Sequence, residues 1–505
     1  MTNDAEVLIA GAGPTGLTLA LWLTKLGIRI RIIDQRDAPA PYSRALGVQP
    51  RTLELYRQLG NLGDEVAQRG LKVQGLNFWT SGRRAAHVPF ANIGEGLTPY
   101  PFVLTFAQDE HERLLIERLA ALGVTVERST KLVGFTQDAN GVDVETENAA
   151  TSQRSSARVA FIAGCDGAHS TVRETIGAGF SGGTYSRLFY VADVDASGRP
   201  IDRDIHIELD EADLLALFPM DGRGRVRLVG TIRDDAAERG RDLRFEDVSH
   251  RAIERLHLDI ARVNWFSTYR VHHRVASRFR DRRAFLLGDA AHVHSPVGAQ
   301  GMNTGIGDSV NLAWKLAAVL RGEAHESLLD TYDSERRAFA QRLVKTTDRI
   351  FTIASKPGGF ARIVRRSVIP IVMPLALRVG PMRRFLFRTV SQLVINYRHS
   401  AISRGRAGAI QGGDRLPWVP DNFAFVSDVR WQAHVYGAAS DDVRRACAEL
   451  DLPLHVFPYN DATKRAGFAT NAIYVIRPDS YVGFAGTSVD AMRAYCAAWK
   501  SSTAD

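Results

Sequence analysis

The chain has 505 residues, of which 45% are hydrophobic and 24% charged, and this excludes both a disordered chain and a single small domain. The formal net charge of +8 gives a mild attraction for anions such as phosphate-bearing cofactors, and without an aromatic and basic module we expect no nucleic-acid partner. The three cysteines form neither a CxxC pair nor a metal-ligand spacing, which predicts no disulfide framework, no metal site and a reducing, cytoplasmic location. No run reaches the roughly 18 apolar residues of a membrane span, and no apolar signal core is visible.

The N-terminal residues predict a dinucleotide-binding unit. A strand is expected over residues 6–10, a helix over 17–25 and a second strand over 28–33. Residues 11–16 read Gly-Ala-Gly-Pro-Thr-Gly, and the second strand ends in Asp34. This is the GxGxxG fingerprint in its required context, with an acid about twenty residues downstream.

Each position of the fingerprint has a physical reason. Gly11 makes the tight turn, Gly13 lets a pyrophosphate approach the backbone, and Gly16 lets the helix pack on the strand. The Asp34 carboxylate can accept hydrogen bonds from a ribose. The cofactor-binding residues predicted here are Gly11, Gly13, Pro14, Thr15, Gly16, Asp34 and Gln35. The fingerprint itself leaves FAD and NAD open.

Short strands and one clear helix follow. The helix is expected over residues 108–121, and Gln108 at its start could by itself be only a cap. Strands are expected over residues 75–79, 102–106, 124–128, 132–138, 142–146 and 159–164, the fourth and fifth joined by an Asn140-Gly141 hairpin turn. Residues 148–158 are polar and are predicted to form a loose turn.

Alternation of apolar and polar residues returns from residue 189 to about residue 280. It predicts strands over 189–194, 205–209, 214–219 and 225–232, which would form an antiparallel sheet inserted between the dinucleotide-binding segments. Aromatic residues on such strands are more often core residues than ligand contacts.

Residues 284–317 read as a strand, a glycine-rich loop and a helix. The strand over 284–287 ends at Gly288 and Asp289, and the loop contains Pro296 and Gly298 before the helix. Free backbone N–H groups and the positive end of the helix dipole would face whatever lies above the strand. The Asp289 carboxylate can hold a sugar or polyol hydroxyl, and glycines admit a flat ring system close to the backbone.

The last third of the chain predicts helices and then a small α/β unit. A helix is expected over residues 327–346, and residues 359–392 mix arginines with apolar residues. This stretch suits a surface helix with one packed face, and we do not expect membrane contact. A new unit begins near residue 412, with strands over 432–436, 454–458 and 472–477 and helices over 441–450 and 488–499.

Several segments resemble one family. The pattern from Gly288 to Lys315 is similar to the second flavin motif of the aromatic-ring hydroxylases, single-component FAD monooxygenases related to p-hydroxybenzoate, phenol and polyketide hydroxylases. Residues 43–54 resemble the mobile flavin loop of this family, residues 165–173 its internal Asp-Gly motif, and residues 329–337 its LxxYxxERR stretch. Residues 474–484 resemble the C-terminal thioredoxin-like domain, here without CxxC, so thiol exchange has no chemical basis.

The resemblance implies roles for individual residues. Arg44, which alone would be taken for a surface arginine, and Gln108 would contact FAD, Asp166 would lie near the pyrophosphate, and Asp289 would hold the ribitol. The helix start at Gly301, Met302 and Asn303 would face the pyrimidine end of the flavin, with Pro296 and Gly298 forming the flavin-ring environment and no protein nucleophile. Because the inserted sheet would roof the substrate pocket, Tyr190, His206, Phe218 and Tyr269 become pocket candidates.

The implied architecture is α/β: a Rossmann-type FAD-binding domain with an inserted antiparallel substrate sheet and a C-terminal thioredoxin-like domain. The FAD-binding domain would take residues 1–74, 101–180 and 281–350, and the sheet domain 75–100 and 181–280. Residues 351–408 would form a helical linker and 409–505 the thioredoxin-like domain.

The implied function is hydroxylation of a small aromatic, phenolic or polyketide-type substrate by FAD, O₂ and a transient NADPH or NADH, through a flavin hydroperoxide. A related N-hydroxylase, epoxidase or Baeyer–Villiger enzyme, or a non-catalytic FAD-binding protein, are the alternatives. A flavin halogenase is disfavoured because the chain has no Trp-x-Trp pair. Whether the chain forms a homodimer is left open.

Overall fold

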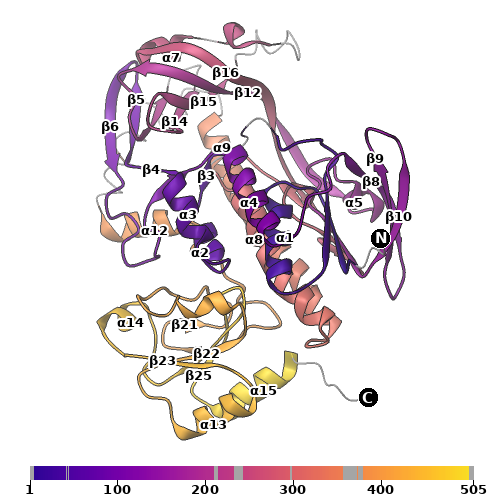
Figure 1. Ribbon diagram of the computed structural model, residues 1–505. Coiled ribbons are helices and arrows are strands. Elements are labelled where there is room, and N and C mark those ends of the chain that lie inside the picture. The colour runs from indigo at the N-terminus through magenta and orange to yellow at the C-terminus, as the bar shows by residue number, and fades with distance from the viewer. Residues whose placement is uncertain are drawn as a thin grey trace.

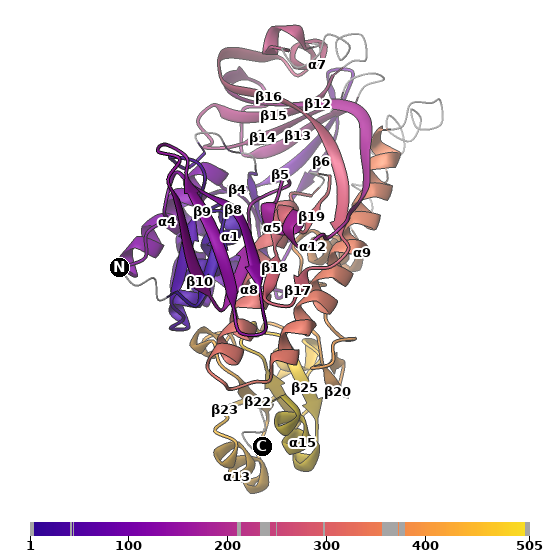
Figure 2. The ribbon, with the colours of Figure 1, turned by 90° about the vertical axis from the view of Figure 1, so that its right-hand side faces the viewer.

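The computed structural model describes residues 5–40, 43, 45–209, 214–232, 243–248, 250–295, 298–355, 372 and 379–499. Arg44 and Pro296 lie outside the described residues. Three parts follow one another along the long axis of the molecule: a large sheet, a central α/β part and a C-terminal part (Figures 1 and 2).

A five-stranded sheet of order β17-β18-β11-β1-β2 forms the centre. The strands β1 (Val7–Ala10), β2 (Ile30–Ile33), β11 (Phe161–Gly164) and β18 (Ala284–Leu286) are parallel, and β17 (Arg280–Asp281) is antiparallel. β1, β11 and β18 are buried along their whole length, as apolar strands covered on both faces must be. The strands predicted over residues 6–10, 28–33, 159–164 and 284–287 are confirmed, with shorter ends.

Three helices pack beside this sheet, with α1 (Pro14–Lys25) in contact with both α4 (Gln108–Ala121) and α8 (Gly301–Leu320). The bounds of α4 are those predicted. α1 begins at Pro14, three residues earlier than predicted (14 against 17), because the fixed φ of proline suits the first helical turn. Thr15 and Gly16 therefore belong to the helix.

A second, three-stranded sheet corrects the predicted meander. Its strands are β8 (Thr130–Gln137), β9 (Val142–Asn148) and β10 (Arg154–Val159). Residues 124–128 form no strand and contribute only a single bridge between Ile33 and Glu127, and residues 154–158, predicted to lie in a loose turn, are part of β10. The prediction was wrong because β10 is an edge strand whose first residues are exposed and polar, so it carries no apolar pattern.

The large sheet has eight strands in the order β19-β16-β12-β15-β14-β13-β5-β6. The bounds are β5 (Gly75–Thr80), β6 (Arg83–Pro89), β12 (Phe180–Gly198), β13 (Asp204–Leu209), β14 (Leu214–Pro219), β15 (Arg225–Thr231), β16 (Leu258–Ala276) and β19 (His292–Val293). The predicted strands are confirmed, but β12 and β16 are each 19 residues long and run from the central part to the far end of the sheet (Figure 2). The sheet is mixed rather than wholly antiparallel, because β13 pairs with β5 in parallel.

One face of this sheet, the outer face, is covered by η1 (Phe245–Asp247) and α7 (Arg251–Arg255), whose apolar side chains share a core with Tyr190 and Leu228. The opposite, inner face turns toward the central part. Smaller elements are α2 (Pro50–Arg57), α3 (Leu62–Arg69), α5 (Thr171–Thr175) and the three-stranded sheet of β3 (Gly47–Val48), β7 (Val103–Thr105) and β4 (Leu71–Val73).

The C-terminal part is built on a six-stranded sheet of order β21-β20-β25-β24-β22-β23. It is preceded by η2 (Gly288–Ala290), η3 (Glu326–Leu329), the long helix α9 (Asp330–Ser355) and α12 (Gly380–Val390). Its elements are β20 (Arg404–Ala407), β21 (Ile410–Gln411), η5 (Phe425–Asp428), β22 (Gln432–Tyr436), α13 (Asp441–Glu449), β23 (Leu454–Phe457), α14 (Asp461–Arg465), β24 (Ile473–Ile476), β25 (Val482–Gly486) and α15 (Val489–Trp499). Most of residues 356–378, within the predicted helical linker, lies outside the described residues.

Candidate functional site

The turn after β1 contains two glycines that the packing of the protein requires and one that it does not require. A Cβ on Gly11, which has a φ of +102°, would overlap the carbonyl oxygen of Cys165, and a Cβ on Gly16 would overlap that of Gly11. A Cβ on Gly13 would meet no atom within 4 Å. The fold itself therefore requires Gly11 and Gly16, whereas the space beside Gly13 is open, as approach of a pyrophosphate requires.

Asp34 at the end of β2 closes this turn from the neighbouring strand. Its Oδ2 accepts the N–H of Ala12 at 2.8 Å, and its Oδ1 accepts the N–H of Arg36 at 2.9 Å. The carboxylate is buried, and Oδ1 also accepts Arg36 Nε at 3.3 Å, so Oδ2 is the oxygen that keeps a further lone pair for a hydroxyl. Gln35 beside it is exposed.

Asp166, at the end of the neighbouring strand β11, holds a buried oxygen without a protein partner. Its Oδ2 accepts the N–H of Val172 at 3.2 Å, whereas no described residue hydrogen-bonds its Oδ1. Burial raises the pKa of this carboxyl, and the nearby Ser170 hydroxyl offsets only part of the effect. A ligand hydroxyl at Oδ1 would satisfy the orphaned atom.

The turn after β18 is fixed by a buried carboxylate. Gly288 has a φ of +58°, and its N–H donates to Asp308 Oδ2 at 3.0 Å. The Cβ of an alanine at Gly288 would lie 2.7 Å from the hydroxyl of Thr15, so this turn and the start of α1 are in close contact. Asp289, the next residue, is exposed. The turns that follow β1, β11 and β18 thus meet at the carboxyl edge of these parallel strands, where open α/β sheets bind ligands.

The start of α8 lies against the same region. The Asn303 side chain accepts the N–H of Gln49 at 2.8 Å and the hydroxyl of Thr52 at 2.7 Å, and its amide donates to the carbonyl oxygens of Gly47 and Ala299. These bonds occupy the whole side chain, so it positions the loop and the helix start rather than reaching outward. Gly301 opens α8, Met302 is half-buried, and the helix has no acidic residue in its first turn.

The loop before α8 carries further polar atoms without protein partners. Gly298 has a φ of +75°, and its carbonyl accepts the side-chain amides of Gln49 and Gln300. No described residue hydrogen-bonds His294 Nε2 or Ser295 Oγ, both of which are buried. Burial, together with the neighbouring His292, lowers the pKa of His294 to about 4, so its ring is neutral at pH 7.

Gln108 holds the loop on both sides of Arg44. Its Oε1 accepts the N–H of Ala45 at 2.8 Å, and its backbone N–H donates to the Ser43 hydroxyl at 2.8 Å. Its Nε2 donates to Glu112. Gln108 is therefore more than a helix cap: it links α4 to the loop that precedes β3.

The four predicted pocket residues divide between the two faces of the large sheet. Tyr190 is buried on the outer face, where its ring stacks at 6.0 Å on Phe266. His206 is on the same face and is held by the Trp79 Nε1–H and Asp202. Phe218 and Tyr269 are on the inner face instead, because register pairs them with Arg227 and Phe189. Of the four, only Phe218 and Tyr269 share a face with Arg227, which contacts the central part at the carbonyl of Ser43.

An inner-face ion pair was not predicted. Arg227 donates to Asp193 at 2.7 and 2.9 Å and to the carbonyl of Ser43 at 2.6 Å, and both side chains are about 3% exposed. Burial raises the pKa of the nearby Tyr269 to about 12, with Arg227 opposing the shift. Alternation alone could not have found this pair, because it does not say which residues of different strands lie opposite one another.

The residues at this edge fit a flavin dinucleotide: an open glycine, ribose-type carboxylates, orphaned buried polar atoms and a helix N-terminus. No group of three or more metal-binding side chains occurs among the described residues. Within the described chain, no helix has the length and apolarity needed to cross a membrane.

Comparison with known proteins shows that the chain belongs to an FAD-binding family. Residues 4–347 match the FAD binding domain family. The chain is 37% identical to 6-methylpretetramide 4-monooxygenase of Streptomyces rimosus, over 96% of this chain and 91% of that protein. It is 33% identical to a 12-dehydrotetracycline 5-monooxygenase/anhydrotetracycline 6-monooxygenase of Streptomyces rimosus subsp. rimosus, over 78% and 77% of the two chains. The structure of an anhydrotetracycline hydroxylase from Streptomyces rimosus superposes with a TM-score of 0.78 at 28% identity, covering 98% of this chain and 99% of that one.

Proposed function

Because the chain belongs to the FAD-dependent monooxygenases that include aromatic-ring and polyketide hydroxylases, we propose that it hydroxylates a phenolic or polyketide-type aromatic ring with O₂ and NADPH or NADH. FAD is the cofactor. The observation that carries the proposal is the carboxyl edge of the central sheet, where the open space at Gly13 and the orphaned Asp166 oxygen match a dinucleotide. A single GxGxxG fingerprint supports transient docking of the nicotinamide cofactor without a second Rossmann domain.

Residues of the chain would bind and orient the cofactor. Asp34 would take the ribose hydroxyls, Gly13 the pyrophosphate and Asp289 the ribitol. FAD, once reduced, supplies the activation of O₂ and the transfer of one oxygen atom to the ring. At the start of α8, free N–H groups and the positive helix end would stabilise negative charge on the reduced ring, since no acid in the first turn opposes them.

The inner face of the large sheet would form the roof of the substrate pocket. Phe218 and Tyr269 lie there beside the Asp193–Arg227 pair, and Arg227 ties this face to Ser43 in the predicted flavin loop. Aromatic side chains on this face would bind the substrate ring and exclude water from it. Tyr190 and His206, on the outer face, would act only through packing.

We also propose the finer division of the chain. The FAD-binding domain would comprise residues 1–74, 101–180 and 281–350, and the sheet domain 75–100 and 181–280, with β19 crossing between them. Residues 409–505 would form a thioredoxin-like domain: its mixed sheet carries α13 and α15, and its cysteines Cys447 and Cys496 are buried in the core between sheet and helices. Cys165, Cys447 and Cys496 form no disulfide, which suits a reducing cytoplasm.

The test is NAD(P)H oxidation by the FAD-loaded protein across simple and polycyclic phenols, including anhydrotetracycline, with hydrogen peroxide measured in parallel. The expected result is strong acceleration by one compound class with little peroxide and recovery of a hydroxylated product. Acceleration with stoichiometric peroxide would identify a bound compound that is not oxygenated. If no compound changed the rate of a fully FAD-loaded protein, the proposal would be wrong.

A further inference from the structure

The Gly288–His292 turn is held from one side by a single buried carboxylate. Asp308 on α8 accepts the N–H of Gly288 at 3.0 Å and the Nε2–H of His292 at 2.8 Å, both on Oδ2. Its other oxygen, Oδ1, accepts Arg336 Nε at 2.6 Å. Asp308 therefore contacts both ends of the turn that contains Asp289.

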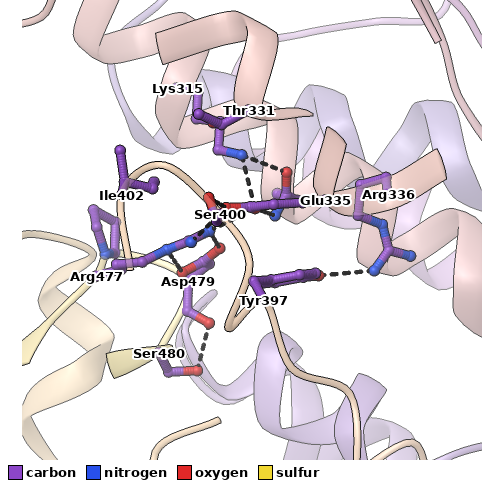
Figure 3. A network of polar contacts seen from close by, with 12 residues as sticks. Lys315, Thr331, Glu335, Arg336, Tyr397, Ser400, Ile402, Arg477, Asp479 and Ser480 are labelled. Atoms are coloured by element: carbon purple, nitrogen blue, oxygen red, sulfur yellow. Dashed lines mark hydrogen bonds and ion pairs between the residues drawn. The ribbon is translucent and has the colours of Figure 1, made fainter. Parts of the chain in front are cut away.

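Arg336 on α9 connects Asp308 to the C-terminal part. Besides Asp308, its guanidinium donates to the carbonyl of Thr304 in the first turns of α8 at 3.0 Å and to the hydroxyl of Tyr397 at 2.8 Å. Arg336 is 1% exposed, so every donor of this fork must be satisfied by protein. Figure 3 shows the hydrogen bond from this guanidinium to the Tyr397 hydroxyl.

Tyr397 is in turn held by the C-terminal part. Its backbone N–H donates to the carbonyl of Gly413 at 2.7 Å, and its ring centre lies 4.4 Å from that of Tyr481. The guanidinium of Arg477, at the end of β24, lies 5.3 Å from the Tyr397 ring centre and 5.6 Å from that of Tyr481. A cation beside two aromatic faces stabilises both rings in place.

Arg477 is itself held by α9, through Glu335, the residue before Arg336. It donates to Glu335 at 2.8 and 3.0 Å and to Asp479 at 3.0 and 2.6 Å (Figure 3). Lys315 also donates to Glu335, at 2.9 Å, from α8. All four side chains are at most 2% exposed, so they have no solvent to replace a lost partner.

We propose that the C-terminal part positions the flavin turn, with Tyr397 and Arg336 as positioning residues that hold Asp308, and through it Gly288, in the geometry that binds FAD. This gives a part without thiol chemistry a role in cofactor retention. The contacts run without a gap from Arg477 and Tyr481 through Tyr397 and Arg336 to the turn. The proposal rests on the assignment of the Gly288–Asp289 turn to FAD.

The test is Tyr397→Phe, which keeps the ring and removes the acceptor of Arg336. Losing one hydrogen bond to a buried charge should weaken FAD binding about tenfold. The matched control is Tyr474→Phe, which removes a buried hydroxyl that bonds only within the C-terminal part, to the N–H of Ala469 and the carbonyl of Ala407. The FAD dissociation constant is measured by flavin fluorescence, and the melting temperature of each apoprotein by circular dichroism.

The expected result is a raised FAD dissociation constant in Tyr397→Phe and an unchanged one in Tyr474→Phe, even where the two apoproteins melt at similar temperatures. Asp289→Ala, tested beside them, separates the two assumptions. Loss of FAD affinity in Asp289→Ala with none in Tyr397→Phe would overturn the positioning role alone. Unchanged affinity in both variants would overturn the assignment of the turn as well. Equal losses in Tyr397→Phe and Tyr474→Phe would reduce the effect to general destabilisation and also overturn the proposal.

Discussion

Two buried polar regions of this molecule differ in how completely their polar atoms are hydrogen-bonded. At the carboxyl edge of the central sheet, Asp166 Oδ1, His294 Nε2 and Ser295 Oγ have no partner among the described residues. Between α9 and the C-terminal part, Glu335 alone accepts five hydrogen bonds, from Arg477, Lys315, Asn311 and Ser400. An unsatisfied buried polar group costs about 1–3 kcal/mol, and a bound ligand at the sheet edge would offset that cost.

The electrostatics show the same contrast. Burial alone would raise the pKa of the Glu335 carboxyl, but Arg477 and Lys315 outweigh it and hold that pKa far below its usual range. Burial does raise the pKa of the Asp166 carboxyl, because the hydrogen bonds from Ser170 and Val172 offset only part of its effect. The oxygens of Glu335 are satisfied by protein groups, whereas the orphaned atoms at the sheet edge would be satisfied by the cofactor proposed to bind there.

Glu335→Gln should give the largest loss of stability, because it removes the charge at the centre of the buried ion pairs between α8, α9 and the C-terminal part. The amide keeps the size of the side chain but removes the ion-pair partner of the buried Lys315 and leaves the buried Arg477 with Asp479 alone. We expect unfolding free energy to fall by about 3 kcal/mol. Chemical denaturation followed by far-UV circular dichroism measures it, and Glu449→Gln, which removes an exposed partner of Arg493, should change nothing measurable. Similar curves for both variants would contradict the contrast between the regions.

Gly13→Ala probes the other region and should have an intermediate effect. The backbone at Gly13 has a φ of −79°, which alanine adopts freely, and its Cβ would touch no protein atom. The apoprotein should therefore melt as before, while the methyl group fills the space that we propose for the pyrophosphate. We expect FAD binding to weaken by at least about tenfold, or roughly 1.4 kcal/mol.

The control for this variant is Gly134→Ala, at a glycine that is equally open but lies in β8. Isothermal titration of the apoproteins with FAD compares the three chains. Unchanged FAD affinity in Gly13→Ala would show that the open space is not part of the cofactor site.

Local patterns in the sequence predicted most of the elements at the carboxyl edge of the central sheet. The strand before Gly11 and the helix after Gly301 are set by apolar spacing within a few residues, and glycine spacing needs no knowledge of distant contacts. Tyr190 and Tyr269 could not be separated in this way, since their faces depend on which residues of other strands lie opposite them. β10 escaped detection because an exposed edge strand needs no apolar side chains.

The ion pairs between α9 and the C-terminal part could not be predicted from the sequence for a different reason. Glu335 and Arg477 lie 142 positions apart, and a charged residue in a helix is usually in solvent. The family motif drew attention to Glu335 and Arg336 but not to their partners. Only the docking of the C-terminal part brings these charges together, and a single sequence contains no periodicity that reports docking.

The smallest effect at neutral pH is expected for His111→Leu, which tests whether orphaned polar atoms away from the ligand edge are a cost. His111 on α4 lies between Tyr56 and Phe106, and no described residue hydrogen-bonds either ring nitrogen. Burial lowers the pKa of His111 to about 3, below its value of about 6.5 in the unfolded chain. Between these pH values the unfolded chain takes up a proton that the folded ring does not, so this histidine makes the unfolding free energy fall as pH falls through that window.

His111→Leu should raise the unfolding free energy by about 1 kcal/mol at pH 7 and by roughly 2 kcal/mol more at pH 5. Denaturant unfolding at the two pH values measures both gains. An equal gain at pH 7 and pH 5 would mean that the ring is protonated in the folded protein, and a loss at pH 7 would mean that its nitrogens have a partner, such as an ordered water, that the protein depends on.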